Sequence, residues 1–235
     1  AFAQGALATF AEQEVAEPHL RVEDCLEAFQ KLAQYYLEKI AVEVIAVTGS
    51  NGKTTTKDMI QAVLSEKYKT YKTQGNYNNE IGMPYTILHM PDDTEKIVLE
   101  MGMDRLGDID LLSKIAKPKI ALVTLIGESH LEFFGTRDKI AEGKLGIKAG
   151  LRPNGELIVP ADKIINKYLP ADTKITRFGP DEDIFVTQII EHKNQLSFTP
   201  NFFDEDITIP VPGKFNATNA MLAAYVGTLL DVEET

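Results

Sequence analysis

A turn suited to phosphate binding is the clearest chemical feature of this sequence. The apolar run Val44–Val47 leads directly into Thr48-Gly49-Ser50-Asn51-Gly52-Lys53-Thr54-Thr55. Two glycines let the backbone turn sharply and bring successive N–H groups near phosphate oxygens, and a following helix adds the positive end of its dipole. In such a turn Lys53 contacts the β- and γ-phosphates of a nucleotide, and the Thr54 hydroxyl holds Mg²⁺. We therefore expect the nucleotide to contact Gly49, Ser50, Asn51, Gly52, Lys53, Thr54 and Thr55.

This turn is a shortened variant of the common phosphate-binding pattern. The pattern G-x-x-x-x-G-K-[ST] requires glycine at position 47, where this chain has Val47. A Gly-x-x-Gly-Lys stretch alone also fits an ordinary strand-to-helix turn with a solvated lysine. The flanks disfavour that alternative, because an uninterrupted apolar strand precedes the turn and apolar residues follow it at helical spacing, at Met59, Ile60, Val63 and Leu64.

Two other predicted strands end in side chains suited to metal chemistry. Glu100 closes the apolar run 96–101, where a carboxylate suits a Mg²⁺ ligand or a water-orienting base. His130 follows the run 120–126 and is a candidate metal ligand. Each residue alone is equally compatible with an exposed side chain. Because both residues follow strands of the same predicted sheet, we favour a functional role for Glu100 in a site near His130.

Two clusters of asparagine could contact ligands. Asn76, Asn78 and Asn79 follow the second strand, where the simpler interpretation is a turn and a helix cap. Asn216 and Asn219 lie three apart at the start of the final helix, after Phe215. Paired amides can read the edge of a purine and an aromatic ring can stack on it, although Asn216 could also be an N-cap.

Alternating strands and helices must position these residues. Strand and helix patterns alternate over 42–48 and 54–66, 69–73 and 80–89, 96–101 and 107–116, and 120–126 and 137–149. This order predicts an α/β fold with a mostly parallel sheet and helices on both faces. Such sheets bind ligands at the carboxyl ends of their strands, which is where the polar clusters occur.

The flanking segments have weaker patterns. Residues 1–21 show little periodicity, and a helix is predicted from Val22 to Ile40. After Gly155 the strands shorten, which predicts a small antiparallel appendage on the edge of the main sheet, with strands at 157–159, 184–187, 196–198 and 207–209. A last helix is expected from Asn216 to about Leu230.

The composition is that of a globular protein. Its 235 residues are 44% hydrophobic and 25% charged, enough for a sizeable core. A net charge of −11 argues against a nucleic-acid-binding or anionic-membrane surface. The single cysteine, Cys25, excludes an intramolecular disulfide and a cysteine zinc site. We expect a soluble, cytoplasmic monomer that does not insert into membranes.

Taken together, these blocks resemble the Mur ligase family, the ATP-dependent amide-forming enzymes of peptidoglycan precursor synthesis. The resemblance spans roughly residues 40–225. Within the family, the sequences of segments 75–84 and 100–103 most resemble those of the members that add D-alanyl-D-alanine. The matching blocks are the turn 48–55, the loop 75–84, the Glu100 strand, His130-Leu131-Glu132 and Asn216-x-x-Asn219.

The resemblance implies a reaction and its partners. ATP would phosphorylate the terminal carboxylate of UDP-N-acetylmuramoyl-tripeptide (UDP-MurNAc-tripeptide), and the amine of D-Ala-D-Ala would attack the acyl phosphate. It implies Mg²⁺ on Thr54 and Glu100, a second Mg²⁺ at His130, and a carbamate on Lys144 as a further metal ligand. Lys53, His130 and Lys144 would be the catalytic residues, Asn216 and Asn219 would contact ATP, and Asn76, Asn78 and Asn79 would contact substrate. Without the resemblance, Lys144 is an ordinary solvated lysine on helix 137–149.

The family also sets the expected domain organisation. Mur ligases have three domains, of which residues 1–40 resemble the tail of the N-terminal uridine-nucleotide-binding domain with a linker helix. Residues 41–235 resemble the central ATP-binding domain, and the C-terminal domain is expected to be absent, so ligation by this chain alone should be poor. This chain departs from the family pattern at two positions: many members have asparagine where it has Leu125 and histidine where it has Phe215. Alternatives are a Mur-type ligase for an earlier peptide step, a folate polyglutamate synthase, or a non-catalytic ATP-binding module.

Overall fold

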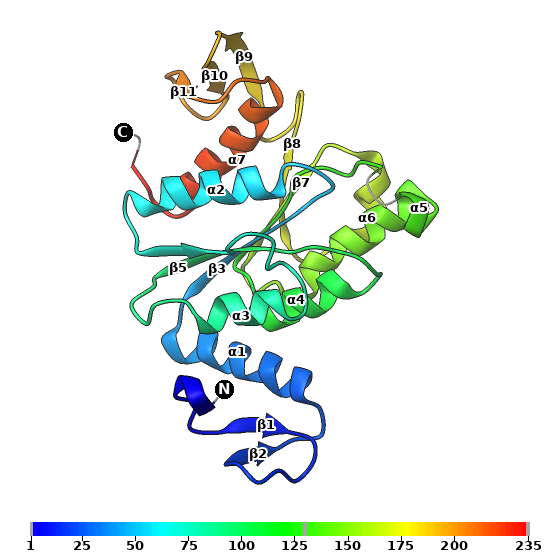
Figure 1. Ribbon diagram of the computed structural model, residues 1–235. Coiled ribbons are helices and arrows are strands. Elements are labelled where there is room, and N and C mark those ends of the chain that lie inside the picture. Colours follow the sequence, from blue (N-terminus) through cyan, green and yellow to red (C-terminus); the bar gives the residue numbers. More distant parts are fainter. Residues whose placement is uncertain (1, 129–130, 234–235) are drawn as a thin grey trace.

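A six-stranded parallel sheet forms the centre of the computed structural model, which describes residues 2–128 and 131–233 (Figure 1). The strand order is β4-β5-β3-β6-β7-β8, and every neighbouring pair is parallel. The predicted α/β fold is confirmed. The strands are β3 (Glu43–Thr48), β4 (Thr70–Lys72), β5 (Lys96–Glu100), β6 (Ile120–Val123), β7 (Glu156–Pro160) and β8 (Lys174–Phe178).

Helices cover both faces of this sheet (Figure 1). Alternate residues of β3 point to opposite faces: Val44 and Ala46 belong to one hydrophobic core, and Ile45 and Val47 to the other. A strand buried on both faces has a nearly continuous apolar sequence, as β3 has. On one face lie α2 (Lys53–Ser65) and α7 (Phe215–Leu229); on the other lie α1 (Cys25–Ile40), α3 (Gly82–Leu88), α4 (Asp108–Ala116) and α6 (Arg137–Leu145).

The predicted helices are confirmed with small shifts at their ends. Helix α1 begins later than Val22, because the Asp24 carboxylate accepts a hydrogen bond from the Glu27 amide at 2.8 Å and caps the helix at that point. Helix α6 ends at Leu145 and continues as a 3₁₀ turn over Gly146–Gly150. Shorter helical segments are α5 (Leu131–Phe134) and 3₁₀ turns at Phe2–Gln4 and Lys163–Tyr168.

The prediction for the region after Gly155 is partly wrong. Residues 157–159 belong to β7, which pairs in parallel with β6 and β8 inside the main sheet, and β8 was not predicted. Every residue of β7 is buried, so its brevity does not mark an edge strand. A separate antiparallel sheet, of order β11-β10-β9, contains β9 (Val186–Glu191), β10 (Leu196–Pro200) and β11 (Ile207–Ile209). Its Leu196 and Phe198 share a core with α7.

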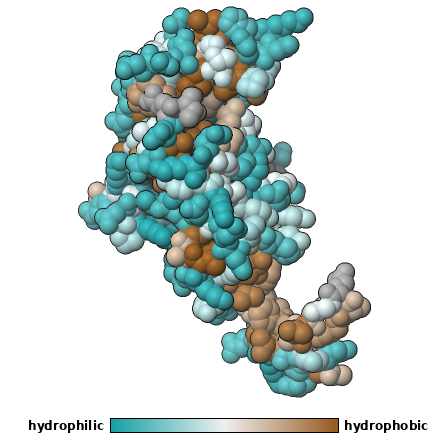
Figure 2. Space-filling view, turned by 90° about the vertical axis from the view of Figure 1, so that its left-hand side faces the viewer, coloured by the Kyte–Doolittle hydropathy of each residue, from teal (hydrophilic) through white to brown (hydrophobic). Residues whose placement is uncertain are grey.

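The N-terminal segment forms an extension beside α1. Strands β1 (Thr9–Ala11) and β2 (His19–Arg21) pair in parallel with each other and not with the main sheet. Hydrophobic side chains gather on this extension, at the bottom of Figure 2, where Leu7 is 90% exposed and Leu20 is 61% exposed. Within residues 2–128 and 131–233, no helix is both long enough and apolar enough to span a bilayer.

Candidate functional site

Three loops converge at the carboxyl ends of the central strands. Strand β3 lies between β5 and β6, with Val47 opposite Glu100 and Thr48 opposite Val123. The turn after β3 therefore has the end of β5 on one side and the loop after β6 on the other. This arrangement fits the general rule that ligands of open parallel sheets bind at the carboxyl ends of the strands.

The turn after β3 requires both of its glycines. Gly49 has φ of 149°, and a Cβ atom there would lie 1.9 Å from the Thr124 hydroxyl oxygen. Gly52 has φ of 81°, in the left-handed region, and a Cβ atom there would lie 2.9 Å from Asn219 Oδ1. The loop after β6 holds the same turn, because Ser50 donates from its amide to the Leu125 carbonyl at 2.8 Å. The Thr124 hydroxyl also donates to the Asn51 carbonyl.

Lys53 is the first residue of α2 and lies over this turn. Its ammonium donates to the Gly49 carbonyl at 3.0 Å. Lys53 lines a cavity of about 140 Å³ at the sheet edge. The positive end of the α2 dipole and the Lys53 charge make this part of the cavity suited to an anion. The other lining residues are Gly49, Ser50, Asn78, Asn79, Glu80, Gly102, Met103, Asp104, Asp108 and Lys144.

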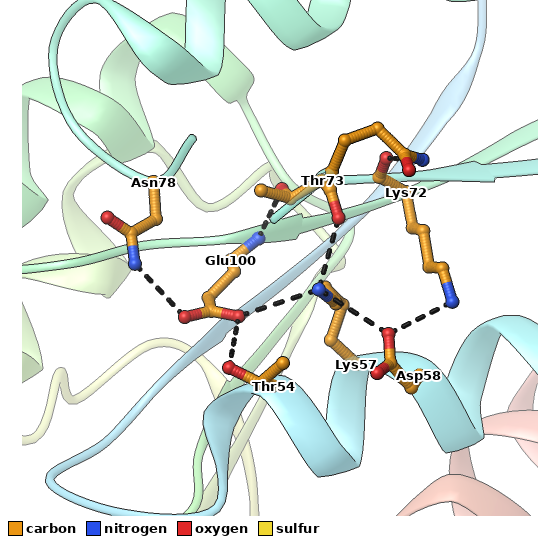
Figure 3. Close-up of polar contacts among 8 residues, drawn as sticks. Thr54, Lys57, Asp58, Lys72, Thr73, Asn78 and Glu100 are labelled. Atoms are coloured by element: carbon orange, nitrogen blue, oxygen red, sulfur yellow. Dashed lines mark hydrogen bonds and ion pairs between the residues drawn. The ribbon is translucent and has the colours of Figure 1, made fainter. Parts of the chain in front are cut away.

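Glu100 lies beside the turn with a polar partner on each carboxylate oxygen (Figure 3). The Thr54 hydroxyl donates to Oε2 at 2.9 Å, and the Asn78 amide donates to Oε1 at 3.0 Å. The Lys57 ammonium lies 3.7 Å from Oε2. Glu100 is only 3% exposed, so these partners stabilise a buried carboxylate. We name Glu100, Thr54, Lys57, Thr73 and Asn78 the Glu100 cluster.

The Glu100 cluster is compatible with a bound Mg²⁺. Thr54 Oγ1 and Glu100 Oε2 are 2.9 Å apart, which is the separation of adjacent ligands in an octahedron with metal–oxygen bonds of about 2.1 Å. Hydroxyl and carboxylate oxygens are also the ligand types that Mg²⁺ prefers. The structure therefore brings together two of the four predicted metal-binding residues.

Lys144 is buried, so the interpretation as a solvated lysine on its helix is wrong. Lys144 lies on α6, is 3% exposed and lines the cavity together with Lys53. Burial, and secondarily the positive charge of Lys53, lower the pKa of Lys144 to about 8. In the described part of the chain Lys144 has no acceptor or counter-ion. An amine of this kind is partly unprotonated near neutral pH and can react with electrophiles.

The three predicted substrate asparagines lie in different environments. Asn78 faces Glu100 rather than open solvent. Asn79 accepts hydrogen bonds from the backbone amides of Gly82 at 2.8 Å and Ile81 at 3.3 Å, so its side chain holds the turn that leads into α3, whose N-cap is Ile81. Asn76 is exposed. Asn78 and Asn79 line the cavity.

The asparagine pair of α7 is buried against the turn. Asn219 donates to the Asn216 side-chain oxygen at 3.2 Å and accepts from the Thr56 hydroxyl at 3.2 Å. Asn216 donates to the Pro212 carbonyl at 2.8 Å and is not the N-cap, which is Lys214. These contacts tie α7 to α2. Phe215, which is 72% exposed, remains available to stack on a base.

Two residues of the Glu100 cluster were not anticipated from the sequence. Lys57 follows Lys53 by four residues, which places both on one face of α2 and is a signal that could have been used. Thr73 follows the short strand β4, and its hydroxyl accepts from the Glu100 amide at 2.9 Å. His130, the predicted second metal ligand, lies outside the residues that the structure describes.

Comparison with known families agrees with this geometry. Residues 47–227 match the family model of the Mur ligase middle domain. The chain belongs to the Mur ligase family. The resemblance predicted from the five sequence blocks is thus confirmed, and its fold prediction with it.

Individual Mur ligases are similar over nearly the whole chain. The UDP-N-acetylmuramoyl-tripeptide–D-alanyl-D-alanine ligase of Bacillus subtilis is 42% identical over 238 residues, covering 99% of this chain and 52% of that protein. A crystal structure of MurF from Acinetobacter baumannii superposes with a TM-score of 0.92 at 34% identity, covering 99% and 53% of the two chains. MurF from Thermotoga maritima in complex with ADP gives a TM-score of 0.89 at 32% identity, covering 100% and 56%. The chain spans about half the length of the relatives that it matches.

Proposed function

We propose that this chain is the ATP-binding part of a ligase that adds D-Ala-D-Ala to UDP-MurNAc-tripeptide through an acyl phosphate. The observation that carries the proposal is the junction of the glycine turn with the Glu100 cluster, where Lys53 and Thr54 lie at the start of one helix and Thr54 contacts Glu100. The similarity to ligases of this name supports the substrate class, and the MurF complex with ADP supports nucleotide binding.

In this proposal the glycine turn binds ATP. Backbone amides of residues 49–55 contact the phosphates, Lys53 releases the Gly49 carbonyl and pairs with phosphate oxygens, and Phe215 stacks on the base. Asn216 and Asn219 fix the start of α7 beside the turn. Thr54 and Glu100 hold Mg²⁺, which when bound supplies positive charge that neutralises the transferred phosphoryl group. Lys53 is thus a catalytic as well as a binding residue.

The acceptor substrates would lie on the other side of the cavity. Asn76, Asn78 and Asn79 belong to the loop after β4, next to the acids Glu80 and Asp108. We assign contacts with the UDP-linked peptide to this loop. His130 keeps its proposed role as a ligand of a second Mg²⁺. Residues 1–40 are proposed as the tail of another domain with a linker helix: β1 and β2 form a sheet separate from the main one, and α1 then packs against the central sheet. A monomeric state and a cytoplasmic location stay predictions.

Lys144 is proposed to carry a carbamate. Its lowered pKa leaves an unprotonated amine that can attack carbon dioxide and lose one proton to solvent, and the product replaces a buried cation by an anion in the cavity that Lys53 also lines. Incubation with ¹³C-bicarbonate should give one carbamate signal by ¹³C NMR. The signal should be absent from Lys144→Met and present in Lys139→Met, which changes an exposed lysine of the same helix. Its persistence in Lys144→Met would contradict the assignment.

Calorimetry with ATP and Mg²⁺ tests the nucleotide site. Lys53→Ala should weaken binding about 100-fold, the size of a charge contact in a desolvated site. Lys67→Ala, beyond the far end of α2, should leave the affinity unchanged. The ligation step needs the full-length parent, assayed for phosphate release with each acceptor pair. We expect phosphate release only when UDP-MurNAc-tripeptide and D-Ala-D-Ala are both present. Release that requires a different pair of substrates would indicate a different ligase.

A further inference from the structure

Lys57 has a place in the site that neither phosphate binding nor ligation explains. We propose that Lys57 is a positioning residue that shields Glu100 from free divalent cations, so that the metal binds together with the nucleotide. The inference rests on the proposed function, in which Glu100 and Thr54 hold Mg²⁺, and it adds the order in which metal and nucleotide occupy the site.

The Lys57 ammonium is fixed by three oxygen atoms. It donates to the Thr73 carbonyl at 3.0 Å, and it lies 3.4 Å from Asp58 Oδ1 and 3.7 Å from Glu100 Oε2 (Figure 3). The residue is 2% exposed. Because the Thr73 carbonyl and the Asp58 carboxylate hold the ammonium independently of Glu100, Lys57 can stay in place when Glu100 takes another partner.

Lys57 is not a second phosphate-binding lysine. Lys53, one helical turn earlier, lines the cavity, whereas Lys57 does not belong to the cavity lining. Its ammonium lies between the ends of β4 and β5, on the side of Glu100 toward Thr73. A buried cation in that position acts on a ligand through Glu100, not by touching it.

The charges around Glu100 disfavour the binding of a divalent cation in the absence of nucleotide. Lys57 balances the Glu100 carboxylate, and Lys53 adds a further positive charge at the cavity. The other charged groups near Lys57, Asp58 and Lys72, form an ion pair at 3.0 Å, so they add no net charge. The cavity lining also includes the acids Glu80, Asp104 and Asp108 and the cation Lys144. At Glu100 itself, a divalent cation alone therefore meets a carboxylate whose charge Lys57 already balances, whereas a nucleoside triphosphate brings its own negative charge. Metal and nucleotide should accordingly bind with positive coupling, which must be reciprocal.

Lys57 could instead simply join α2 to the end of β4. In that case, replacing it would lower stability without changing the affinity for a free metal ion. Under the proposal, removing the charge raises that affinity, because a dication is no longer repelled at short range. We expect an increase of about tenfold or more, from Coulomb repulsion at an effective protein dielectric constant.

Mn²⁺ binding without nucleotide, followed by electron paramagnetic resonance, tests the inference. Lys57→Met should bind Mn²⁺ about tenfold tighter than the unmodified chain. Lys57→Arg, which keeps the charge, and Lys72→Met, which removes a charge of the same network that does not face Glu100, should both stay within about twofold of it. With a non-hydrolysable ATP analogue present, the difference between Lys57→Met and the unmodified chain should shrink.

Two results would overturn the inference. One is unchanged Mn²⁺ affinity in a folded Lys57→Met, with Lys57→Gln as the substitute if that variant does not fold. The other, which needs no variant, is that the unmodified chain binds Mn²⁺ equally well with and without the ATP analogue. Failure to bind the analogue at all would instead refute the proposed function, and the comparison of Mn²⁺ alone would still decide the role of Lys57.

Discussion

The Glu100 cluster and the surroundings of Lys144 lie at the same edge of the sheet but treat a buried charge in opposite ways. Glu100 has the Thr54 hydroxyl, the Asn78 amide and the Lys57 ammonium within 3.7 Å. Lys144 is equally buried and, within residues 2–128 and 131–233, has no acceptor. The described residues thus supply partners for one charged side chain and none for the other.

This difference separates two contributions to the site. A buried charge with protein partners makes a single substitution costly, because removing one partner leaves the other uncompensated. A buried cation without partners disfavours the folded chain, because its desolvation is not offset. Substitutions in the two regions should therefore change stability in opposite directions.

The largest expected effect comes from removing the carboxylate of the Glu100 cluster. Glu100→Ala removes one of the two carboxylates near the buried Lys57 ammonium and also the acceptor of the Thr54 and Asn78 hydrogen bonds. It should lower the free energy of unfolding by about 3–5 kcal/mol in urea denaturation. Glu43→Ala is the matched control, since Glu43 pairs with Lys96 and Lys119 at the opposite, more exposed edge. Its cost should be about 1 kcal/mol. Equal costs for the two substitutions would remove the distinction drawn for Glu100.

Lys144→Met should have the opposite sign. Below pH 8 the folded and unfolded chains both carry the Lys144 charge, so the folded chain bears the whole desolvation cost. As pH rises from about 8 to 10.5, the folded chain loses this proton first and the cost disappears. In bicarbonate-free buffer, Lys144→Met should therefore be more stable than the unmodified chain by about 3 kcal/mol at pH 7, and by little at pH 10.5. Exposed Lys139→Met should show no such pH dependence, and a stability gain for Lys144→Met that did not vary with pH would contradict this account.

Asn78→Ala tests how much one partner contributes to the cluster. The substitution removes a 3.0 Å hydrogen bond to a buried carboxylate and should cost about 2 kcal/mol of unfolding free energy. Asn76→Ala, in the exposed part of the same loop, should change stability by less than about 0.5 kcal/mol. If both substitutions were neutral, Thr54 and Lys57 alone would be sufficient to stabilise Glu100.

The smallest effect is expected for a side chain in neither region. Phe215→Ala should leave stability within about 0.5 kcal/mol, because the ring is 72% exposed. It should weaken ATP binding about fivefold through the loss of base stacking, measured by calorimetry. Phe215→Tyr, which keeps the ring, is the control. Unchanged affinity in Phe215→Ala would place the base elsewhere.

The sequence was sufficient for the parts of the fold that repeat a local pattern. Strand β3, the glycine turn and α2 follow from an apolar run, two glycines and helical spacing, and the end position of Glu100 follows from its strand. The same reasoning could not detect that 157–159 lies inside the parallel sheet, because strand order depends on contacts distant in sequence.

The partners of the predicted site residues were harder to anticipate. Asn78 meets Glu100 across 22 positions, and Asn219 meets Thr56 across 163. Lys144 carried no sequence signal for burial, since α6 is weakly amphipathic and also bears exposed charges such as Lys139. The family resemblance implied a catalytic role for Lys144, but only the packing of α6 in the structure shows that this lysine is buried.

The close packing of Thr124 against Gly49 fixes the backbone conformation of the glycine turn when the protein folds. Thr124 holds the turn from the neighbouring strand end with no ligand involved, so the turn becomes ordered as the sheet assembles and binding need not order it again. An isolated peptide of residues 44–65 would have the same glycines and the same lysine but no such clamp. The peptide would lose conformational entropy when it binds, so its affinity for phosphate should be lower than that of the folded chain.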